Sequence, residues 1–250
     1  VFGYASPFCV DACGYCDERA WREDRDAVSF MGCCKARKEL LMSMNTTNCA
    51  YATEQLLEVK NITKSFGNTV VLDDFSYKFE RGVYVLSEPS GAGKTTLLRI
   101  LCGLEVADSG TVLKSPDAKT VMMFQEDRLL ENLSVMANIM LAIQLHPKEQ
   151  KQSARERIKE ALCGVGLEGT ENKPVSELSG GQKRRVALLR TLFADADILL
   201  FDEPLKGLDE ALKQQVIASV KPFIESKVVI WVTHTPEEVK LLGSYTALQL

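Results

Sequence analysis

The sequence predicts an α/β fold built around a glycine-rich turn between a strand and a helix. Three segments carry this prediction. The first is a glycine-rich turn at residues 88–96, between an apolar run and an apolar-periodic stretch. The second is an apolar strand at 198–201 that ends in two carboxylates. The third, at 178–182, places two glycines directly before a helix. Strand and helix signals alternate from residue 56 onward, as is typical of an α/β core.

The first segment predicts a strand at 83–86, a tight turn and a helix from residue 94. Gly91 and Gly93 let the backbone approach an anion closely, so that N–H groups surround phosphates at the positive end of the helix. Lys94 adds charge for the β- and γ-phosphates, and the Thr95 hydroxyl is placed to ligate Mg²⁺. A plain glycine turn is the alternative. The predicted nucleotide contacts in this segment are Glu88, Pro89, Ser90, Gly91, Ala92, Gly93, Lys94, Thr95 and Thr96.

The second segment reads as a fully buried parallel strand, because residues 198–201 are all apolar. Asp202 at its end can hold the shell of the magnesium ion, and Glu203 can polarise an attacking water. The alternative for such an acidic pair is a helix cap or a solvated turn, which Pro204 would also suit.

The third segment, Leu178-Ser-Gly-Gly-Gln182, is the most specific signal in the chain. Its glycines free the backbone just before a helix, and such a helix start is an anion site. With the two other segments it resembles the ATP-binding cassette (ABC) family of transporter ATPases over roughly residues 56–250. The resemblance implies a P-loop NTPase core with a mixed sheet, a RecA-like part and a helical subdomain. The signature residues are Ser179, Gly180, Gly181 and Gln182.

In that family the signature binds the γ-phosphate of the ATP held by the opposite subunit, so the resemblance implies a dimer, and we expect a homodimer. Phe66 matches an aromatic residue that stacks on adenine, with a core phenylalanine as the alternative. Gln125 matches a glutamine that reaches the magnesium ion. Asp209 matches the acidic residue of a loop that communicates across the dimer. His234 matches a switch histidine at the γ-phosphate, with a satisfied core histidine as the alternative.

One residue departs from the family pattern, since the phosphate loop normally begins with glycine and this chain has Glu88. Its carboxylate either points away from the phosphates or faces them. In the second case, like charges at about 4 to 6 Å would repel by roughly a few kcal/mol at an effective dielectric near 20. We therefore expect an active enzyme whose ATP affinity is at or below that of its family.

Composition favours a cytosolic protein. The chain has 250 residues, 46% of them hydrophobic, and a net charge of −4, which gives no general attraction to nucleic acid. No apolar run reaches 18 residues, and the opening residues lack the pattern of a secretory signal. We expect the protein on the cytoplasmic face of the membrane as a peripheral subunit. His146, in a polar stretch, is expected in a surface loop.

The chain divides near residue 55 into a Cys-rich extension, 1–55, and the cassette, 56–250. Residues 129–177 read as a helical subdomain, which in the family docks on the membrane partner. A permease and a solute-binding protein on separate chains are therefore expected. The loops at 124–130 and 203–209 look most like those of the nitrate, sulfonate and taurine importer ATPases, so import of a small anion or organic solute is predicted.

The extension holds six of the eight cysteines. Cys9, Cys13 and Cys16 have the spacing of the cluster loop of radical S-adenosylmethionine enzymes, and three such thiolates could hold a [4Fe–4S] cluster. A zinc site would need a fourth ligand such as Cys33 or Cys34. The remaining alternative is an extension without metal or a gene-start artefact, since Met42 or Met44 would be a plausible start.

Three classes of function remain at this point. The first is an ATPase that drives import through a permease, with Glu203 activating water and His234 holding the geometry. The second is a soluble cassette ATPase acting on nucleic acid or ribosomes, a class that usually carries paired cassettes or long coiled coils. The third is a metal-dependent redox or sensor module at the N-terminus with the ATPase as its output, which the clustered cysteines support.

Overall fold

The computed structural model describes residues 56–89, 91–143 and 151–250, all within one compact unit. The strands are β1 (Leu57–Phe66), β2 (Thr69–Phe79), β3 (Gly82–Leu86), β4 (Ser109–Lys114), β5 (Thr120–Met123), β6 (Ile198–Asp202), β7 (Val228–Val232) and β8 (Thr246–Leu248). The helices are α2 (Lys94–Leu101), α3 (Val135–Met140), α4 (Lys151–Gly164), the 3₁₀ helix η4 (Val175–Glu177), α5 (Gly180–Leu192), α6 (Glu210–Ile224) and α7 (Pro236–Leu242). The strands and helices expected around the three motifs are all present.

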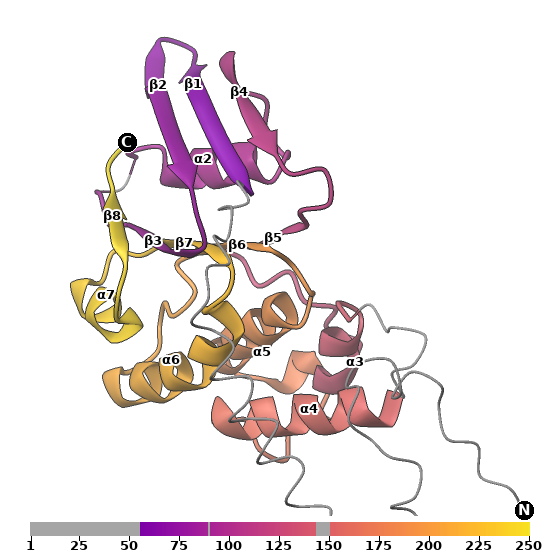
Figure 1. Cartoon of the computed structure of the whole chain (residues 1–250). Coiled ribbons are helices and arrows are strands. Elements are labelled where there is room, and N and C mark those ends of the chain that lie inside the picture. The colour runs from indigo at the N-terminus through magenta and orange to yellow at the C-terminus, as the bar shows by residue number, and fades with distance from the viewer. Residues whose placement is uncertain (1–55, 90, 144–150) are drawn as a thin grey trace, which may run out of the picture. The chain divides into compact units, whose positions relative to one another are not determined.

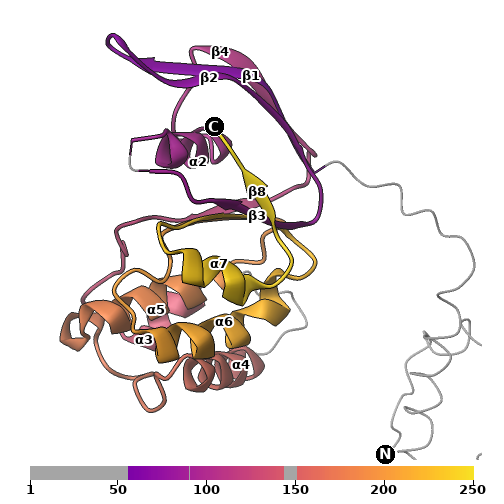
Figure 2. The ribbon, with the colours of Figure 1, turned by 90° about the vertical axis from the view of Figure 1, so that its left-hand side faces the viewer.

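The strands form two sheets of different kinds. Five of them make a parallel sheet in the order β5-β6-β7-β3-β8, and three make an antiparallel sheet in the order β2-β1-β4. Helix α2 lies between the two sheets, and α5, α6 and α7 cover the other face of the parallel sheet (Figure 1; Figure 2). The mixture of strand directions expected from the sequence is therefore divided between two sheets.

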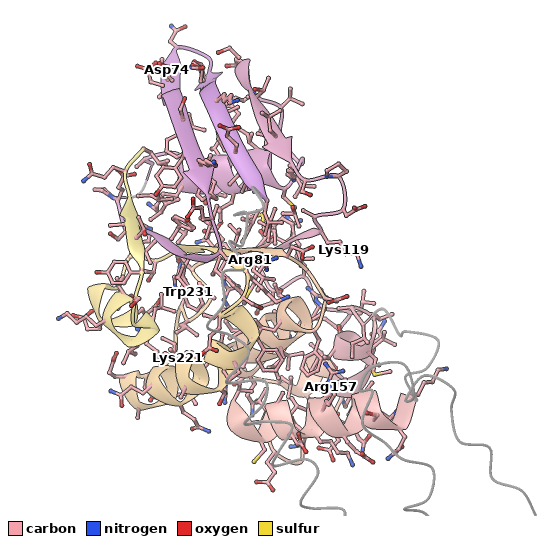
Figure 3. All side chains as sticks on the ribbon, viewed as in Figure 1. Asp74, Arg81, Lys119, Arg157, Lys221 and Trp231 are labelled. Carbon is pink, nitrogen blue, oxygen red and sulfur yellow. The ribbon has the colours of Figure 1, made fainter. Side chains whose placement is uncertain are left out.

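The apolar strands β6 and β7 have both faces covered, which explains their uninterrupted hydrophobic sequences. Alternate side chains enter different clusters: Leu200 and Ile230 pack with α2, while Phe201 and Trp231 pack with the helical layer. The rings of Phe201 and Trp231 have centroids 5.0 Å apart. Trp231 is fully buried on β7 (Figure 3). The central strands are thus fixed from both sides by the core.

The register of the parallel sheet brings four strand ends to one edge. Leu86 at the end of β3 pairs with Val232 of β7, and Val232 pairs with Asp202 of β6. Met123, at the end of β5, pairs with Phe201. Ligands of open parallel sheets bind at the carboxyl ends of the strands. The loops that leave β3, β5, β6 and β7 therefore converge on one place.

The described residues between β5 and α5 include α3, α4 and η4. Helix α3 begins after Ser134, whose hydroxyl accepts a hydrogen bond from the N–H of Ala137. Buried residues of α3 and α4, among them Ile139 and Ile158, join the core under α5 and α6. In the part of the chain that the structure describes, every helix is too short or too polar to cross a membrane.

Candidate functional site

A cavity of about 400 Å³ opens where the four strand ends converge. It is lined by residues from both sheets and from the start of α2. They are Phe66, Val71, Gly91, Gly93, Lys94, Thr95, Thr96, Gln125, Asp202, Glu203, Val232 and His234. Ten of these twelve residues are among the site residues predicted from the sequence. Residues of the phosphate turn, the end of β6 and the turn after β7 therefore meet in one cavity.

The phosphate turn depends on a glycine, because any other residue at that position would force the neighbouring backbone to move. Gly93 has φ +85° and forms the N-cap of α2 without any side-chain cap. A Cβ atom there would lie 2.5 Å from the carbonyl oxygen of Val71. The Lys94 ammonium donates to the carbonyls of Glu88 and Pro89, at 2.6 and 2.7 Å. The positive end of α2 and the lysine thus face the cavity together.

The predicted magnesium ligands lie beside this turn. The Thr95 hydroxyl donates to Oδ2 of Asp202 at 2.9 Å, and Gln125 lines the same cavity. Burial raises the pKa of Asp202 above its usual range, and the Glu203 carboxylate adds to the rise, while the Thr95 hydrogen bond opposes it. Three hard oxygen donors, one of them a buried carboxylate with a raised pKa, fit a divalent cation such as Mg²⁺, which prefers oxygen ligands.

Glu203 is held in an unusual conformation. Its φ is +49°, in the left-handed region that residues other than glycine seldom adopt. Oε1 lies 3.1 Å from Nε2 of His234, and Oε2 lies 2.8 Å from Nζ of Lys206. Backbone strain of this kind persists only where the surrounding structure enforces it, and it clusters at functional sites. The carboxylate is thereby aimed at the histidine across the cavity.

The turn that carries His234 is fixed by a buried network that the sequence did not predict. The Thr233 hydroxyl donates to Oε2 of Glu238 at 2.7 Å and accepts from the N–H of Thr235 at 3.1 Å. Oε1 of Glu238 lies 3.3 Å from Nζ of Lys213 on α6, and the lysine side chain is buried. His234 itself is 37% exposed, so the core-histidine alternative does not hold.

Phe66 is also exposed, by 52%, at the end of β1. Since it lines the cavity, the alternative of a core phenylalanine does not hold either. An exposed aromatic ring at the mouth of a polar cavity is suited to stacking on a planar base. This geometry is compatible with the predicted adenine contact.

The signature residues lie outside this cavity. Ser179 is the N-cap of α5, where its side chain accepts from the Gln182 N–H and the Gln182 side chain accepts from the Ser179 N–H. Gly180 is exposed and Gly181 is half-buried. Asp209 caps α6 by accepting from the N–H of Leu212 at 2.9 Å. None of these residues lines the cavity of its own chain, as expected if they act on a nucleotide held by another subunit.

The Glu88 carboxylate does not line the cavity. Oε1 accepts from the backbone N–H of Leu250 at 3.0 Å, so the side chain reaches the segment after β8. Of the two orientations left open by the sequence, the structure has the one in which the carboxylate stays out of the cavity.

Some predicted sites fall outside the described residues: Ser90, His146 and the cysteines Cys9, Cys13 and Cys16. The iron–sulfur and zinc predictions for the cysteines therefore stay predictions. Within 56–89, 91–143 and 151–250, His, Cys, Asp and Glu side chains form no cluster of three or more that could hold a metal.

Sequence reasoning missed the contacts of two cations with Glu203, those of Lys206 and Arg184. Lys206 follows Glu203 by three residues, a spacing that could have suggested the ion pair. Arg184 is buried and donates to the carbonyls of Asp202 and Glu203. It shares the helix face of Leu188, four residues on, which could have indicated a buried arginine rather than a solvated one.

Comparisons with known proteins agree with this site. Residues 72–206 match the family model described as ABC transporter. The chain is 36% identical over 197 residues to an Fe(3+) ions import ATP-binding protein, FbpC, of Mannheimia succiniciproducens, and equally to that of Photorhabdus laumondii. Each alignment covers 74% of this chain and 56% of the relative, so the chain spans about half the length of these relatives.

Solved structures give the same picture. The dimeric structure of MJ0796, a bacterial ABC transporter cassette, superposes with a TM-score of 0.66 at 27% identity, over 78% of this chain and 94% of that one. A dimeric post-hydrolysis state of the ATP-binding cassette MJ0796, bound to ADP and Pi, gives a TM-score of 0.65 at 26% identity over the same shares.

Proposed function

Because the chain belongs to the ABC transporter family, we propose that it is the ATP-binding subunit of a transporter and hydrolyses ATP as a dimer to drive import through a separate permease. The observation that carries the proposal is the single cavity lined by Lys94, Thr95, Asp202, Glu203 and His234. Phosphoryl transfer needs positioning and charge stabilisation more than covalent chemistry, and these residues supply both.

The residues divide the work of hydrolysis. Glu203 accepts a proton from water as its oxygen attacks the γ-phosphorus in line, and the bond to the bridging oxygen of ADP breaks. His234, 3.1 Å from Glu203, holds the carboxylate and the γ-phosphate in register. Lys94 and the N–H groups of the phosphate turn stabilise the developing charge. Mg²⁺, held by Thr95, Asp202 and Gln125, would neutralise charge on the β- and γ-phosphates.

A second subunit is needed to complete each site. Ser179 to Gln182 lie outside the cavity of their own chain, at the start of α5, where Ser179 and Gly180 are exposed. In this proposal they cap the γ-phosphate bound by the partner, with Asp209 at the contact between the two. The dimeric MJ0796 structures support this arrangement by similarity. We place the subunit on the cytoplasmic face of the membrane, with residues 129–177 facing the permease.

The direction and the solute are finer proposals. The FbpC relatives are named for import of Fe(3+) ions, which supports import as the direction. The loops at 124–130 and 203–209 look most like those of the nitrate, sulfonate and taurine importer ATPases. That resemblance would imply a small anion or organic solute and a solute-binding protein. Stimulation of ATP hydrolysis by Fe(3+) or by these anions, in the transporter assembled with its binding protein, would decide between them.

The test of the central proposal is magnesium-dependent ATP hydrolysis by the purified chain over a range of protein concentrations. We expect activity to rise more than linearly with protein, because two chains form each site. Glu203→Gln should bind ATP normally and lose turnover by about 100-fold or more. The exposed Glu168→Gln removes the same charge far from the cavity and serves as the control. Wild-type turnover in Glu203→Gln would refute the assignment.

A further inference from the structure

Arg184 lies on α5, two residues beyond the signature, and its side chain is buried. One end of its guanidinium group, Nη1, faces the loop that follows β5. Nη1 donates to the carbonyl oxygens of Phe124 and Gln125, at 2.8 and 2.9 Å, and to Oδ1 of Asp127 at 2.9 Å. The loop that carries Gln125 into the cavity is therefore held by a side chain of the signature helix.

The other end of the group, Nη2, faces the end of β6. It donates to the carbonyl oxygens of Asp202 and Glu203, at 2.6 and 2.7 Å. These two residues supply the magnesium ligand and the water-activating carboxylate in the proposed mechanism. Arg184 thus contacts the backbone of both residues without lining the cavity itself.

The reason for this contact lies in the sheet. Strands β5 and β6 pair as far as Met123 and Phe201, and beyond that pair the ladder ends. The carbonyl groups of the next residues would be left without partners at buried or partly buried positions, which is costly. A guanidinium group is a rigid, planar fork of donors, so it can bind both departing backbones at a fixed separation.

The contact also bears on the conformation of Glu203. Its φ of +49° is an unfavourable conformation for glutamate and needs external support. The N–H of Glu203 donates to the carbonyl of Val232 at 2.9 Å, and its carbonyl accepts from Arg184. The peptide groups on both sides of the strained Cα atom are thereby fixed. From this fixed backbone the side chain reaches His234 and Lys206.

We propose that Arg184 is a positioning residue that sets the separation between Gln125 and Glu203, so that movement of the Gln125 loop reaches the water-activating carboxylate. The inference rests on the proposed function, since it concerns how that site is held. Arg184 touches neither nucleotide nor water in this mechanism. It acts through backbone groups of the residues that do.

The test compares Arg184→Gln and Arg184→Lys with the wild-type chain. A glutamine cannot span the two strand ends, so we expect kcat to fall about 10- to 100-fold while KM for ATP stays within about threefold. A lysine keeps the buried charge but binds as a point donor, so it can serve only one strand end. We expect Arg184→Lys to fold and to show a kcat about tenfold below wild type.

The matched control is Arg190→Gln on the same helix. Arg190 donates to the carbonyls of Asp127 and Arg128, at 3.0 and 2.8 Å, so it holds the same loop but no residue of β6. Its kcat should stay within about threefold of wild type. Thermal unfolding of all variants separates loss of fold from loss of positioning.

The outcomes separate the two proposals. If the wild-type chain hydrolyses ATP and Arg184→Lys keeps wild-type kcat, the positioning role is overturned. Equal losses of kcat in Arg184→Gln and Arg190→Gln would also overturn it, because tethering of the loop alone would then suffice. An inactive wild-type chain would instead contradict the proposed function, and binding of a fluorescent ATP analogue would show whether the cavity still takes nucleotide.

Discussion

Helix α2 follows Gly93 and helix α5 begins with Gly180, and in our proposal both present backbone N–H groups to a phosphate, yet the two helix starts are built differently. At α2, Gly93 offers no side-chain cap, and the free N–H groups face the cavity. At α5, Ser179 and Gln182 form a capping box that already satisfies two N–H groups, and the helix start is exposed. The first of the two is open to a phosphate within its own chain.

This difference indicates a division of labour. The start of α2 is surrounded by Lys94, Thr95 and the acidic end of β6, so a single chain can bind a nucleotide there. The start of α5 has no such surroundings in its own chain, and its box keeps it stable until a partner's phosphate arrives. One helix start is thus complete in the protomer, and the other depends on dimerisation. Substitutions at the two sites should therefore separate binding from turnover.

The largest contrast should come from the glycines. In Gly93→Ala the new Cβ atom meets the Val71 carbonyl at 2.5 Å with φ at +85°, so the turn must move. We expect ATP affinity to fall about 100-fold. In Gly181→Ala the new atom meets only the flexible tip of Leu208 at 3.2 Å, so affinity should stay within about twofold while turnover falls about tenfold.

Titration with a fluorescent ATP analogue and steady-state hydrolysis measure the two quantities for each variant. Normal nucleotide affinity in Gly93→Ala would contradict the role of α2. Full turnover in Gly181→Ala would contradict the role of α5.

A smaller contrast should come from two serines with the same local structure. Ser179 and Ser134 both have φ −66° and ψ 161° and cap their helices by accepting from a backbone N–H. Replacing either by alanine should lower the free energy of unfolding by about 1 kcal/mol. Only Ser179→Ala should also lose turnover, by about tenfold, because only α5 faces the partner's phosphate in our proposal.

Chemical denaturation and ATP hydrolysis of the two serine variants make this comparison. If turnover falls equally in both, the loss reflects helix stability and the signature hydroxyl has no special role. A loss confined to Ser179→Ala would sharpen the distinction between a capped helix and an acceptor site.

The sequence was sufficient to predict the parts of the site that are local. The strand–turn–helix unit around Lys94, the apolar strand before Asp202 and the helix after Ser179 each follow from a short window of residues. Parallel strand ends must share an edge, so the meeting of the first two parts followed as well. The sequence does not show which side chains of β6 and β7 face α2 and which face the helical layer, because both faces are buried and apolar.

Long-range polar contacts could not be predicted in the same way. The bond between Glu88 and Leu250 joins residues 162 apart, and the Thr233–Glu238–Lys213 network depends on how α6 lies against α7. Nothing in a local pattern tells which partner a buried charged side chain finds. Such contacts follow from packing, which fixes the distance between helices only after the core has formed.

The smallest effect on nucleotide binding should come from Glu88, although it stands at the start of the phosphate turn. Its Oε1 binds the Leu250 N–H, and its Oε2 is buried without a partner in the described part of the chain. Glu88→Gln keeps the acceptor and removes the charge, whereas Glu88→Gly removes the contact. We expect ATP affinity and turnover within about twofold of wild type in both, and a loss of about 1 kcal/mol of unfolding free energy in Glu88→Gly alone.

The two Glu88 variants decide what the unusual residue does. Both remove the charge, but only Glu88→Gly also removes the contact with Leu250. If ATP affinity rises about tenfold in both, the carboxylate reaches the phosphates and repels them, and the orientation away from the cavity is not the one that binds nucleotide. If affinity is unchanged and only Glu88→Gly loses stability, the carboxylate anchors the segment after β8. The start of α2 then keeps its open phosphate site because the extra charge is held on the far side of the turn.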